Sequence, residues 1–290
     1  MKHFATKDKF NVFRLPVCWQ YLVAGKRGAA LDATAIGVYD QLVGACLGTG
    51  AYCIIDVHNY ARWENKVIGQ SEVTRNEFAS LWYNIAAKYK GEAKVIFGVM
   101  NEPHDVGDIN DWALTVQYAV NSIRSAGAEQ QMILLPGTAF TSVGDSLPTG
   151  SAVALNTVTD PKGTGANPKK NLIYDVHQYL DTDWQGKATE CAHDGVDGLN
   201  TLYNWLKTNN RQALLTETGG GSTDSCAKNL CAELDWMNYH SDQYLGWVGW
   251  AAGAFPVNYE LQEAPKVSNG VYTDRDIVRL CVAGKFNAAA

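Results

Sequence analysis

Residues 52–60 read YCIIDVHNY, and residues 171–179 read NLIYDVHQY. Each stretch begins with an apolar run and ends with Asp, Val, His, one amide residue and Tyr. Near-continuous apolar runs of this length are typical of parallel strands that are buried on both faces. The pair therefore predicts two strands whose carboxyl ends carry similar polar groups. Two interpretations stay open at this point: a metal site built from two histidines and two aspartates, or a barrel that presents its strand ends to one pocket.

The rest of the chain alternates short apolar runs with longer segments of helical periodicity. The strands we expect are 10–15, 52–57, 94–100, 131–135, 171–176, 213–217 and 244–250, and the helices include 34–48, 74–90, 109–126, 197–210 and 227–241. This alternation predicts parallel strands joined by helical crossovers, in a (β/α)8 TIM barrel or a doubly wound sheet. No G-x-G-x-x-G follows the first strand, and polar residues gather at strand ends, which favours a single TIM-barrel domain over residues 1–290.

One strand of that barrel is absent from the pattern. Seven strands are expected where a barrel needs eight, and the first begins near residue 10. An open barrel would leave unpaired backbone groups on the strands at 10–15 and 244–250. The N-terminal strand is therefore missing or replaced, and three explanations remain open. The recorded chain lacks a piece, another segment or a partner subunit fills the gap, or the two neighbouring strands close it.

Composition narrows the class of protein. Apolar residues make up 46% and charged residues 19% of the 290 residues, which is an ordinary globular composition. No apolar run approaches the roughly 20 residues that a membrane-spanning helix needs. The net charge of −6 argues against nucleic acid and against an anionic membrane surface as partners, since both require a basic face. A neutral polymer remains compatible with this charge.

Seven cysteines occur, and none has the C-x-x-C spacing of a zinc ribbon or redox motif. Six of them can pair, which leaves one. The pairings that we expect are Cys46 with Cys53 across a short turn, Cys191 with Cys226, and Cys231 with Cys281. Three disulfides would favour an oxidising compartment over the cytosol.

Two glutamates carry the strongest chemical signal. Glu102 ends an apolar strand in GVMNEPHD, and Glu217 ends another in ALLTETGGG. Two carboxyl groups that face one pocket can hydrolyse a glycosidic bond, because one protonates the leaving oxygen while the other attacks the anomeric carbon. Taken singly, each glutamate is equally well explained by a structural ion pair at a strand end. Both at strand ends of one barrel favour the catalytic interpretation.

Six segments together resemble the fungal-type endoglucanases of glycoside hydrolase family 5, in the same order and from about residue 3 to residue 282. They are FRLPVCWQYL, YCIIDVHNYARW, GVMNEPHD, NLIYDVHQYLD, NRQALLTETGGG and YLGWVGWAAG. The resemblance implies a secreted (β/α)8 enzyme without a cofactor that cleaves internal β-1,4-glucan bonds with retention of configuration. It also implies that Glu102 is the acid/base and Glu217 the nucleophile, and that Cys18, where relatives often have Gly, is the unpaired thiol.

The same resemblance gives roles to residues around the two glutamates. Arg14 is expected to contact the nucleophile and lower its pKa, and Asn101 to bind the sugar 2-hydroxyl. His177 and Tyr179 are expected near the catalytic carboxyls, where Tyr179 would donate a hydrogen bond to Glu217. For Arg14 the alternative is a structural ion pair, and for Asn101 a turn beside Pro103.

Further residues complete the expected binding site. Trp250 resembles the platform on which the sugar at the cleavage site stacks, although a Trp at a strand end is often a core residue. His58 and His177 are interpreted as hydrogen-bonding groups and not as metal ligands, so no metal is expected. Trp63 is the favoured candidate for stacking on a more distant glucose unit. Trp19, Tyr60, Phe140 and Trp184 are weaker candidates for the same task.

The expected partner is β-1,4-glucan or its cello-oligosaccharides, with no nucleic acid and no membrane. The chain is expected to be a monomer unless a partner subunit supplies the missing strand. The alternatives are a related barrel hydrolase that acts on mannan, xylan or mixed-linkage glucan, and a catalytically impaired barrel that only binds β-glucan. A metal-dependent hydrolase is a further alternative.

Overall fold

A computed structural model describes residues 1–163, 169, 171–256 and 258–289 of the chain. The chain divides into two compact units. The central unit is Asn11–Asp175, and the terminal unit combines Met1–Phe10 with Val176–Ala290. Residues 171–179, which carry one of the two repeated motifs, run from the first unit into the second.

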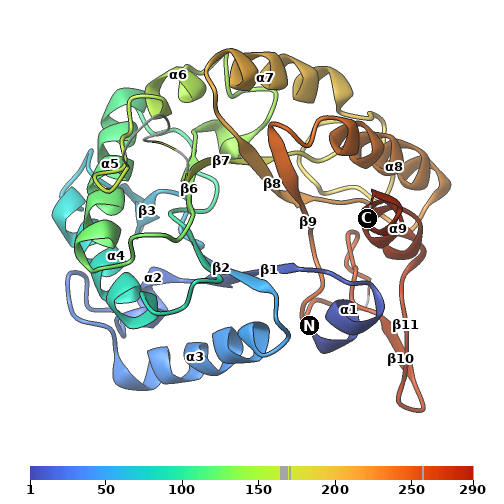
Figure 1. Ribbon diagram of the computed structural model, residues 1–290, viewed down its shortest axis with the longest axis horizontal. Helices are drawn as coiled ribbons and strands as arrows, with labels where there is room; N and C mark the ends of the chain where they lie inside the picture. Colours follow the sequence, from blue (N-terminus) through green and yellow to red (C-terminus); the bar gives the residue numbers. More distant parts are fainter. Residues whose placement is uncertain (164–168, 170, 257, 290) are drawn as a thin grey trace. The chain divides into compact units, whose positions relative to one another are not determined.

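The long strands of the central unit are parallel and neighbour one another in the order β1-β2-β5-β6-β7. They are β1 (Val12–Val17), β2 (Tyr52–Val57), β5 (Val95–Gly98), β6 (Ile133–Pro136) and the first part of β7 (Leu172–His177). The long helices α3 (Ala33–Leu47), α4 (Arg75–Tyr89) and α5 (Ile109–Ser125) lie on one side of these strands (Figure 1). The smaller elements are α2 (Trp19–Leu22), β3 (Arg62–Trp63), β4 (Lys66–Val67), η1 (Ala139–Thr141) and α6 (Ser151–Leu155).

The helices of the central unit begin where the sequence supplies a cap and are tied to the strands by tryptophans. The Asp32 side chain accepts a hydrogen bond from the backbone at the start of α3, and Thr74 forms a capping box with Glu77 at the start of α4. Trp82 and Trp112 are fully buried, and each indole N–H donates to a backbone carbonyl after a strand. The helices therefore hold the carboxyl ends of the strands in place.

The terminal unit contains β8 (Ala213–Thr218) paired in parallel with β9 (Tyr244–Gly249). The long helix α7 (Val196–Thr208) precedes β8 in the chain, and the long helix α8 (Asp224–Tyr239) connects β8 to β9. The remaining elements are the hairpin of β10 (Lys266–Ser268) and β11 (Val271–Thr273), the π-helix η2 (Val278–Val282), α9 (Ala283–Ala289) and α1 (Lys2–Lys7). All seven expected strands are thus confirmed, and in the described part of the chain no strand precedes β1.

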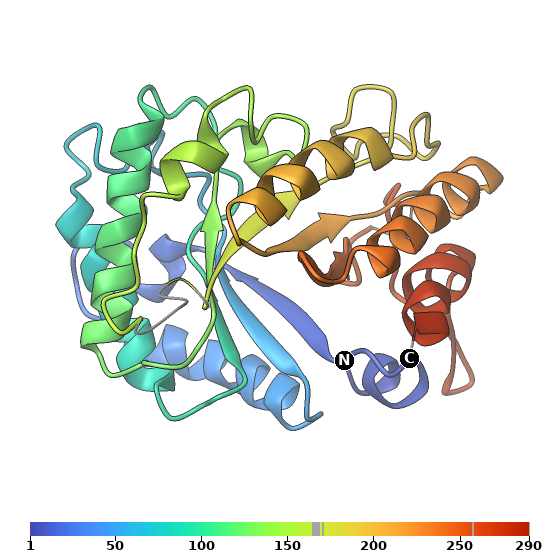
Figure 2. The ribbon, with the colours of Figure 1, turned by 45° about the horizontal axis from the view of Figure 1, so that its top comes forward.

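The N-terminal segment forms a helix that packs on the C-terminal elements of its own unit (Figure 2). The Phe4 and Phe10 rings lie 5.5 Å apart, and Phe10 meets the Phe286 ring at 6.1 Å. His3 Nε2 lies 2.6 Å from Asp274 Oδ1, and Lys7 pairs with the same carboxylate. Aromatic contacts and ion pairs therefore fasten residues 1–10 to chain that is more than 250 positions away.

The three expected disulfides are confirmed, and Cys18 is free and exposed. The pairs are Cys46 with Cys53, Cys191 with Cys226, and Cys231 with Cys281. The last pair closes a segment of 50 residues and links α8 to η2, so in the chain-entropy account it removes the most freedom from the unfolded chain.

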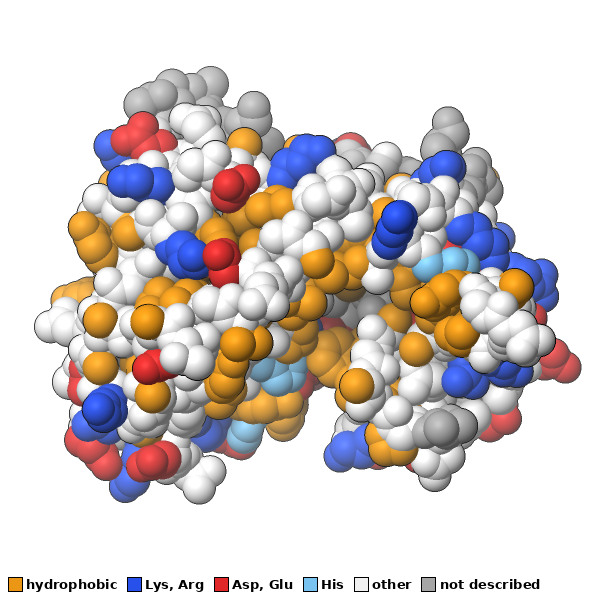
Figure 3. Space-filling model, turned by 90° about the horizontal axis from the view of Figure 1, so that it is seen from below, with side chains coloured by type: hydrophobic (Ala, Val, Ile, Leu, Met, Phe, Trp, Pro, Cys, Tyr) orange, Lys and Arg blue, Asp and Glu red, His pale blue; other side chains and the backbone are white. Residues whose placement is uncertain are grey.

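The surface agrees with the composition. Among the described residues, no helix has both the length and the apolar character that crossing a membrane requires. On the face drawn in Figure 3, Lys and Arg side chains are interspersed with acidic and neutral ones.

Candidate active site

Strand β1 and the carboxyl ends of β2 and β5 bring together four polar side chains of the central unit. Arg14 Nη2 donates to Asn101 Oδ1 at 2.5 Å and lies 3.1 Å from Asp56 Oδ2. The same Asp56 oxygen lies 2.7 Å from His58 Nδ1. Arg14 and Asp56 side chains are 2% and 1% exposed, so this ion pair is shielded from solvent. The buried carboxylate thereby fixes both the guanidinium and the imidazole.

These contacts also determine how His58 presents its second nitrogen. Because Asp56 accepts the proton of Nδ1, Nε2 of a neutral imidazole is left as an acceptor. Asn101 Nδ2 lies 3.2 Å from that nitrogen, and the Tyr60 hydroxyl lies at the same distance. His58 and Asn101 are therefore part of one hydrogen-bonding network, as expected of groups that bind a sugar together.

Glu102 follows this network directly and is partly exposed. Its backbone has φ of +40°, a left-handed conformation that costs free energy in a residue with a side chain. The flanking backbone is held on both sides, since Asn101 N donates to Val57 O at 2.9 Å and Phe140 N donates to Pro103 O at 2.9 Å. The carboxyl group is thus carried on a fixed turn just beyond a strand.

The terminal unit gathers two of the predicted residues, His177 and Tyr179, around Glu217. This glutamate lies in β8 and is 3% exposed. The Tyr179 hydroxyl donates to Glu217 Oε2 at 2.6 Å, and His177 Nδ1 lies 3.6 Å from the same oxygen. The other imidazole nitrogen of His177 lies 2.9 Å from Thr216 Oγ1. Since a phenol that donates to a carboxylate favours its charged form, Tyr179 stabilises Glu217 as an anion.

Trp250 stands just after β9 in the same unit and is partly exposed. Its backbone N–H donates to Thr218 O at 2.7 Å, so the residue is attached to the end of the strand that carries Glu217. Its indole N–H donates to the Tyr259 hydroxyl at 3.0 Å, which fixes the orientation of the ring. Burial raises the pKa of Tyr259, so that its hydroxyl stays protonated at neutral pH.

Two buried carboxyl groups behind these residues were missed by the sequence analysis. Glu233 on α8 is fully buried and accepts hydrogen bonds from Thr218 Oγ1 at 2.8 Å and Gln178 Nε2 at 2.7 Å. Glu263 packs so closely on Gly249 that no side chain would fit there. Burial raises the pKa of each carboxyl to about 8. An acidic residue in a helix or loop gives no sequence signal that it lies inside the protein.

The prediction for Trp63 is not supported. Its side chain is 3% exposed and packs edge-on against the Trp19 ring, with centroids 5.0 Å apart and planes at 78°. Trp19 is itself fully buried. A ring that is covered on all sides offers no face to a sugar, so this pair belongs to the core of the central unit. Tyr60 and Phe140, by contrast, are 38% and 50% exposed.

The structure therefore places the predicted residues in two groups. Arg14, His58 and Asn101 contact one another in the central unit and precede Glu102 there. His177 and Tyr179 contact Glu217 in the terminal unit. Each group contains one of the two glutamates, and in the second group the side chains of His177 and Tyr179 contact it directly.

A family model described as Cellulase (glycosyl hydrolase family 5) matches residues 1–255. The chain belongs to glycoside hydrolase family 5. Endoglucanase EG-II of Hypocrea jecorina is 50% identical over 286 residues, which are 98% of this chain and 67% of the relative. The manganese dependent endoglucanase Eg5A of Phanerodontia chrysosporium is 42% identical over 266 residues, covering 91% of this chain and 67% of the relative.

A solved structure of this family is also very similar. The crystal structure of Cel5A (EG2) from Hypocrea jecorina has a TM-score of 0.94 and 50% sequence identity, covering 98% of this chain and 85% of that one. The family 5 chain described here therefore has the expected (β/α)8-barrel fold with seven parallel strands in the described residues. The prediction of a glycoside hydrolase of the endoglucanase type is confirmed, and the three disulfides are consistent with an extracellular protein.

Proposed function

We propose that the protein hydrolyses internal β-1,4-glucan bonds by double displacement, with Glu217 as nucleophile and Glu102 as acid/base. The observation that carries the proposal is the hydrogen bond of 2.6 Å from the Tyr179 hydroxyl to Glu217 Oε2. A buried carboxylate that accepts such a bond is held as an anion in one orientation, which is what a nucleophile needs.

In the first step the Glu217 carboxylate attacks the anomeric carbon while the glycosidic C–O bond breaks. Glu102 gives its proton to the departing oxygen, which leaves as a sugar hydroxyl. In the second step Glu102, now a carboxylate, takes a proton from water, and the resulting hydroxide displaces Glu217 from the sugar. The proposal requires both carboxyl groups to face one glycosidic bond, with a separation of about 5 Å in a retaining enzyme.

The remaining residues receive binding roles in this proposal. Asn101 and His58 bind sugar hydroxyls, and Arg14 holds Asn101 and Asp56 in position. Trp250 supplies the aromatic face on which the sugar at the cleavage site stacks, and its bond to Tyr259 keeps that face fixed. Fixed side chains lower the barrier because little reorganisation is needed when the substrate binds.

The substrate proposed is β-1,4-glucan and its cello-oligosaccharides, and the enzyme is proposed to act outside the cell as a monomer. Relatives named endoglucanases support the substrate class. The polymer itself is tested by release of reducing sugar from carboxymethylcellulose, mannan, xylan and mixed-linkage glucan in parallel. Faster release from mannan or xylan would replace the proposed substrate by the alternative one.

The nucleophile is tested with a 2-deoxy-2-fluoro-cellobioside that carries a good leaving group. Such a substrate forms the covalent intermediate quickly enough but hydrolyses slowly, so the protein should gain the mass of one fluorinated cellobiosyl group. Peptide analysis should place that mass on Glu217, and the Glu217→Gln variant should gain none. Labelling at any other residue would contradict the assignment.

Metal dependence is tested separately, because one relative is named for manganese. Double displacement by two carboxyl groups requires no metal ion, so activity should survive dialysis against EDTA. Loss of activity that Mn²⁺ restores would support the metal-dependent alternative.

We also expect an acidic pH optimum, because Glu102 must be protonated while Glu217 is ionised. A rate that still rises above pH 8 would contradict that pairing.

A further inference from the structure

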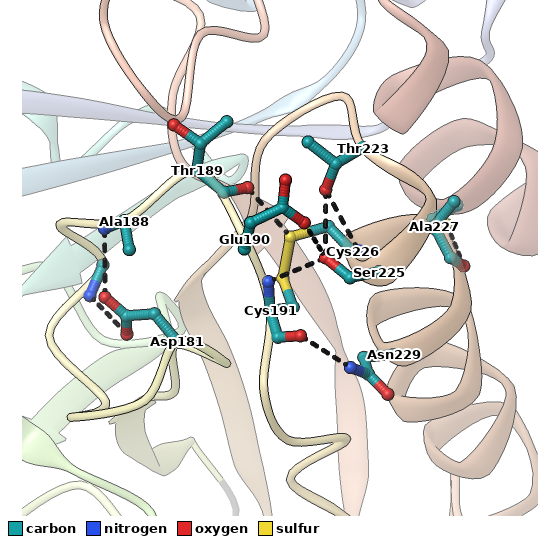
Figure 4. The surroundings of a disulfide bond; sticks show 12 residues. Asp181, Ala188, Thr189, Glu190, Cys191, Thr223, Ser225, Cys226, Ala227 and Asn229 are labelled. Carbon is teal, nitrogen blue, oxygen red and sulfur yellow. Dashed lines mark hydrogen bonds between the residues drawn. A yellow bond between two sulfur atoms is a disulfide. The ribbon is translucent and has the colours of Figure 1, made fainter.

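The loop that follows Tyr179 has a shape fixed by one buried carboxylate. Asp181 is 3% exposed and accepts hydrogen bonds from the backbone N–H groups of Gly186 at 3.0 Å, Lys187 at 2.9 Å and Ala188 at 3.1 Å (Figure 4). Burial opposes ionisation of Asp181, but the backbone bonds outweigh it and lower the pKa of this carboxyl. The charged side chain therefore holds residues 181–188 in one conformation through its backbone hydrogen bonds.

The far end of this loop is fastened to α8. Figure 4 shows the disulfide between Cys191 and Cys226, with the Cys191 N–H donating to Ser225 Oγ at 3.1 Å. Asn229 Nδ2 in turn donates to the Cys191 carbonyl at 3.1 Å. A covalent bond and two hydrogen bonds thus prevent the loop from moving away from the helix.

Trp184 projects from this rigid loop with an exposed ring. Its side chain is 47% exposed, and its indole lies flat on the His193 ring, with centroids 4.2 Å apart and planes at 5°. Its backbone adopts φ of +62°, a conformation that is costly for a bulky side chain. Stacking on His193 covers one face of the indole. Because the residue is 47% exposed, much of the remaining ring surface is accessible to solvent.

The loop touches the proposed catalytic residues through Tyr179. Gly186 lies so close to the Tyr179 ring that an added Cβ would come within 2.7 Å of Cδ1. The hydroxyl of that same ring donates to Glu217. Trp184 therefore lies two positions before Gly186, which packs against the Tyr179 ring, and the hydroxyl of that ring donates to the proposed nucleophile Glu217.

We infer that Trp184 is a stacking platform for a glucose unit bound outside the cleavage site. The inference rests on the proposed function and names a further part of the same substrate. The axial hydrogens of a β-glucose ring form an apolar face of the size of an indole, and burying two such faces is favourable. A platform that is already rigid loses little conformational entropy when the sugar binds, which separates Trp184 from an ordinary exposed side chain.

The test compares substrates that do and do not extend beyond the cleavage site. We expect Trp184→Ala to lower the ratio of kcat/KM for cellohexaose to that for cellotetraose by about 5-fold, the range of one aromatic contact. The loss should lie mainly in KM. Trp184→Phe should restore most of the ratio, and His193→Ala, which removes the support under the indole, should lower it partly.

Tyr239→Ala is the matched control, since Tyr239 is 87% exposed at the end of α8. It should keep the wild-type ratio. An unchanged ratio in Trp184→Ala would overturn the inference, whereas failure of the wild-type protein to cleave either substrate would overturn the proposed function. Calorimetric binding of cellohexaose is a second readout without turnover. Trp184→Ala should raise Kd about 5-fold, and equal affinity to wild type would contradict the inference even in an inactive protein.

Discussion

The two near-identical motifs at residues 56–60 and 175–179 end in different environments. At the end of β2, His58 is held by Asp56 from its own strand at 2.7 Å, and its side chain is 20% exposed. At the end of β7, His177 is 2% exposed and points to the following strand, with Thr216 at 2.9 Å and Glu217 at 3.6 Å. The same residue types thus form part of a hydrogen-bonding network with Arg14 and Asn101 in one unit and contact a carboxylate in the other.

The difference teaches that the neighbouring strand decides what a strand-end motif does. The tyrosines show this most clearly. Tyr60 is 38% exposed and its hydroxyl meets His58, while Tyr179 is 9% exposed and its hydroxyl meets Glu217. We infer that the second motif, and not the first, acts directly on the reacting group. Four changes test this contrast.

The largest effect is expected from Glu217→Gln. The amide cannot attack the anomeric carbon, so kcat should fall by at least about 10⁴-fold on carboxymethylcellulose and on cellohexaose. The variant keeps the size of the side chain and can still accept the Tyr179 hydrogen bond, so cellohexaose should bind with near wild-type affinity. Near-normal turnover would show that the reacting carboxylate lies elsewhere.

The two tyrosines are compared next. Tyr179→Phe removes a hydrogen bond to a charged group, which is worth about 1.5–3 kcal/mol, so kcat should fall about 10- to 100-fold. Loss of that bond also raises the pKa of Glu217, so the acidic limb of the pH–rate profile should move upward. Tyr60→Phe is the matched change at the other motif and should cost about 2-fold or less, without a pH shift. Equal losses in the two variants would break the contrast.

Much of this arrangement could be predicted from the sequence, for a definite physical reason. Strands such as β2 and β8 are buried on both faces, so their apolar runs stop where the chain reaches the polar edge. His58 follows β2 and Glu217 lies near the end of β8, so the point where each apolar run stops marks these candidate residues in the sequence. Of the disulfides, only Cys46–Cys53 spans a short turn that the sequence makes visible, whereas the other two join cysteines 35 and 50 positions apart.

Other features depend on contacts that no local pattern carries. Trp63 and Trp184 both lie in connections that follow long strands, Trp63 in the short β3 after β2 and Trp184 after β7, yet one is 3% and the other 47% exposed. Their burial depends on which other side chains cover them, and the ring contacts are with Trp19 for Trp63 and with His193 for Trp184. The helix α1 escaped prediction for the same reason, since it is held by contacts with residues 272–286.

The third change addresses the carboxylate of the first motif. Asp56→Asn removes the charge that pairs with Arg14 and fixes the tautomer of His58. We expect kcat/KM to fall about 10-fold, the size reported for loss of a group that orients another. Asp40→Asn, which removes a surface carboxylate from Lys88, is the control and should leave activity unchanged. Full activity in Asp56→Asn would limit that residue to packing.

The smallest effect concerns Glu263, a buried carboxyl of the terminal unit for which no ion pair is found among the described residues. Asp56 lies against Arg14 and His58, whereas burial raises the pKa of Glu263 to about 8. An unfolded glutamate ionises near pH 4.3, so between about pH 4.5 and 8 the unfolded chain releases a proton that the folded protein keeps. The contribution of Glu263 to the free energy of unfolding therefore falls as the pH rises through this window.

Glu263→Gln has no proton to release, so it should be less sensitive to pH than the wild type. Urea unfolding at pH 5 and pH 8 measures this, and the difference between the two free energies should shrink by at least about 1 kcal/mol in the variant. Glu260→Gln changes an exposed neighbour and should keep the wild-type difference. If both variants kept the wild-type difference between the free energies of unfolding at pH 5 and pH 8, the carboxyl of Glu263 would be ionised in the folded protein. Glu263 and Asp56 would then not differ in charge.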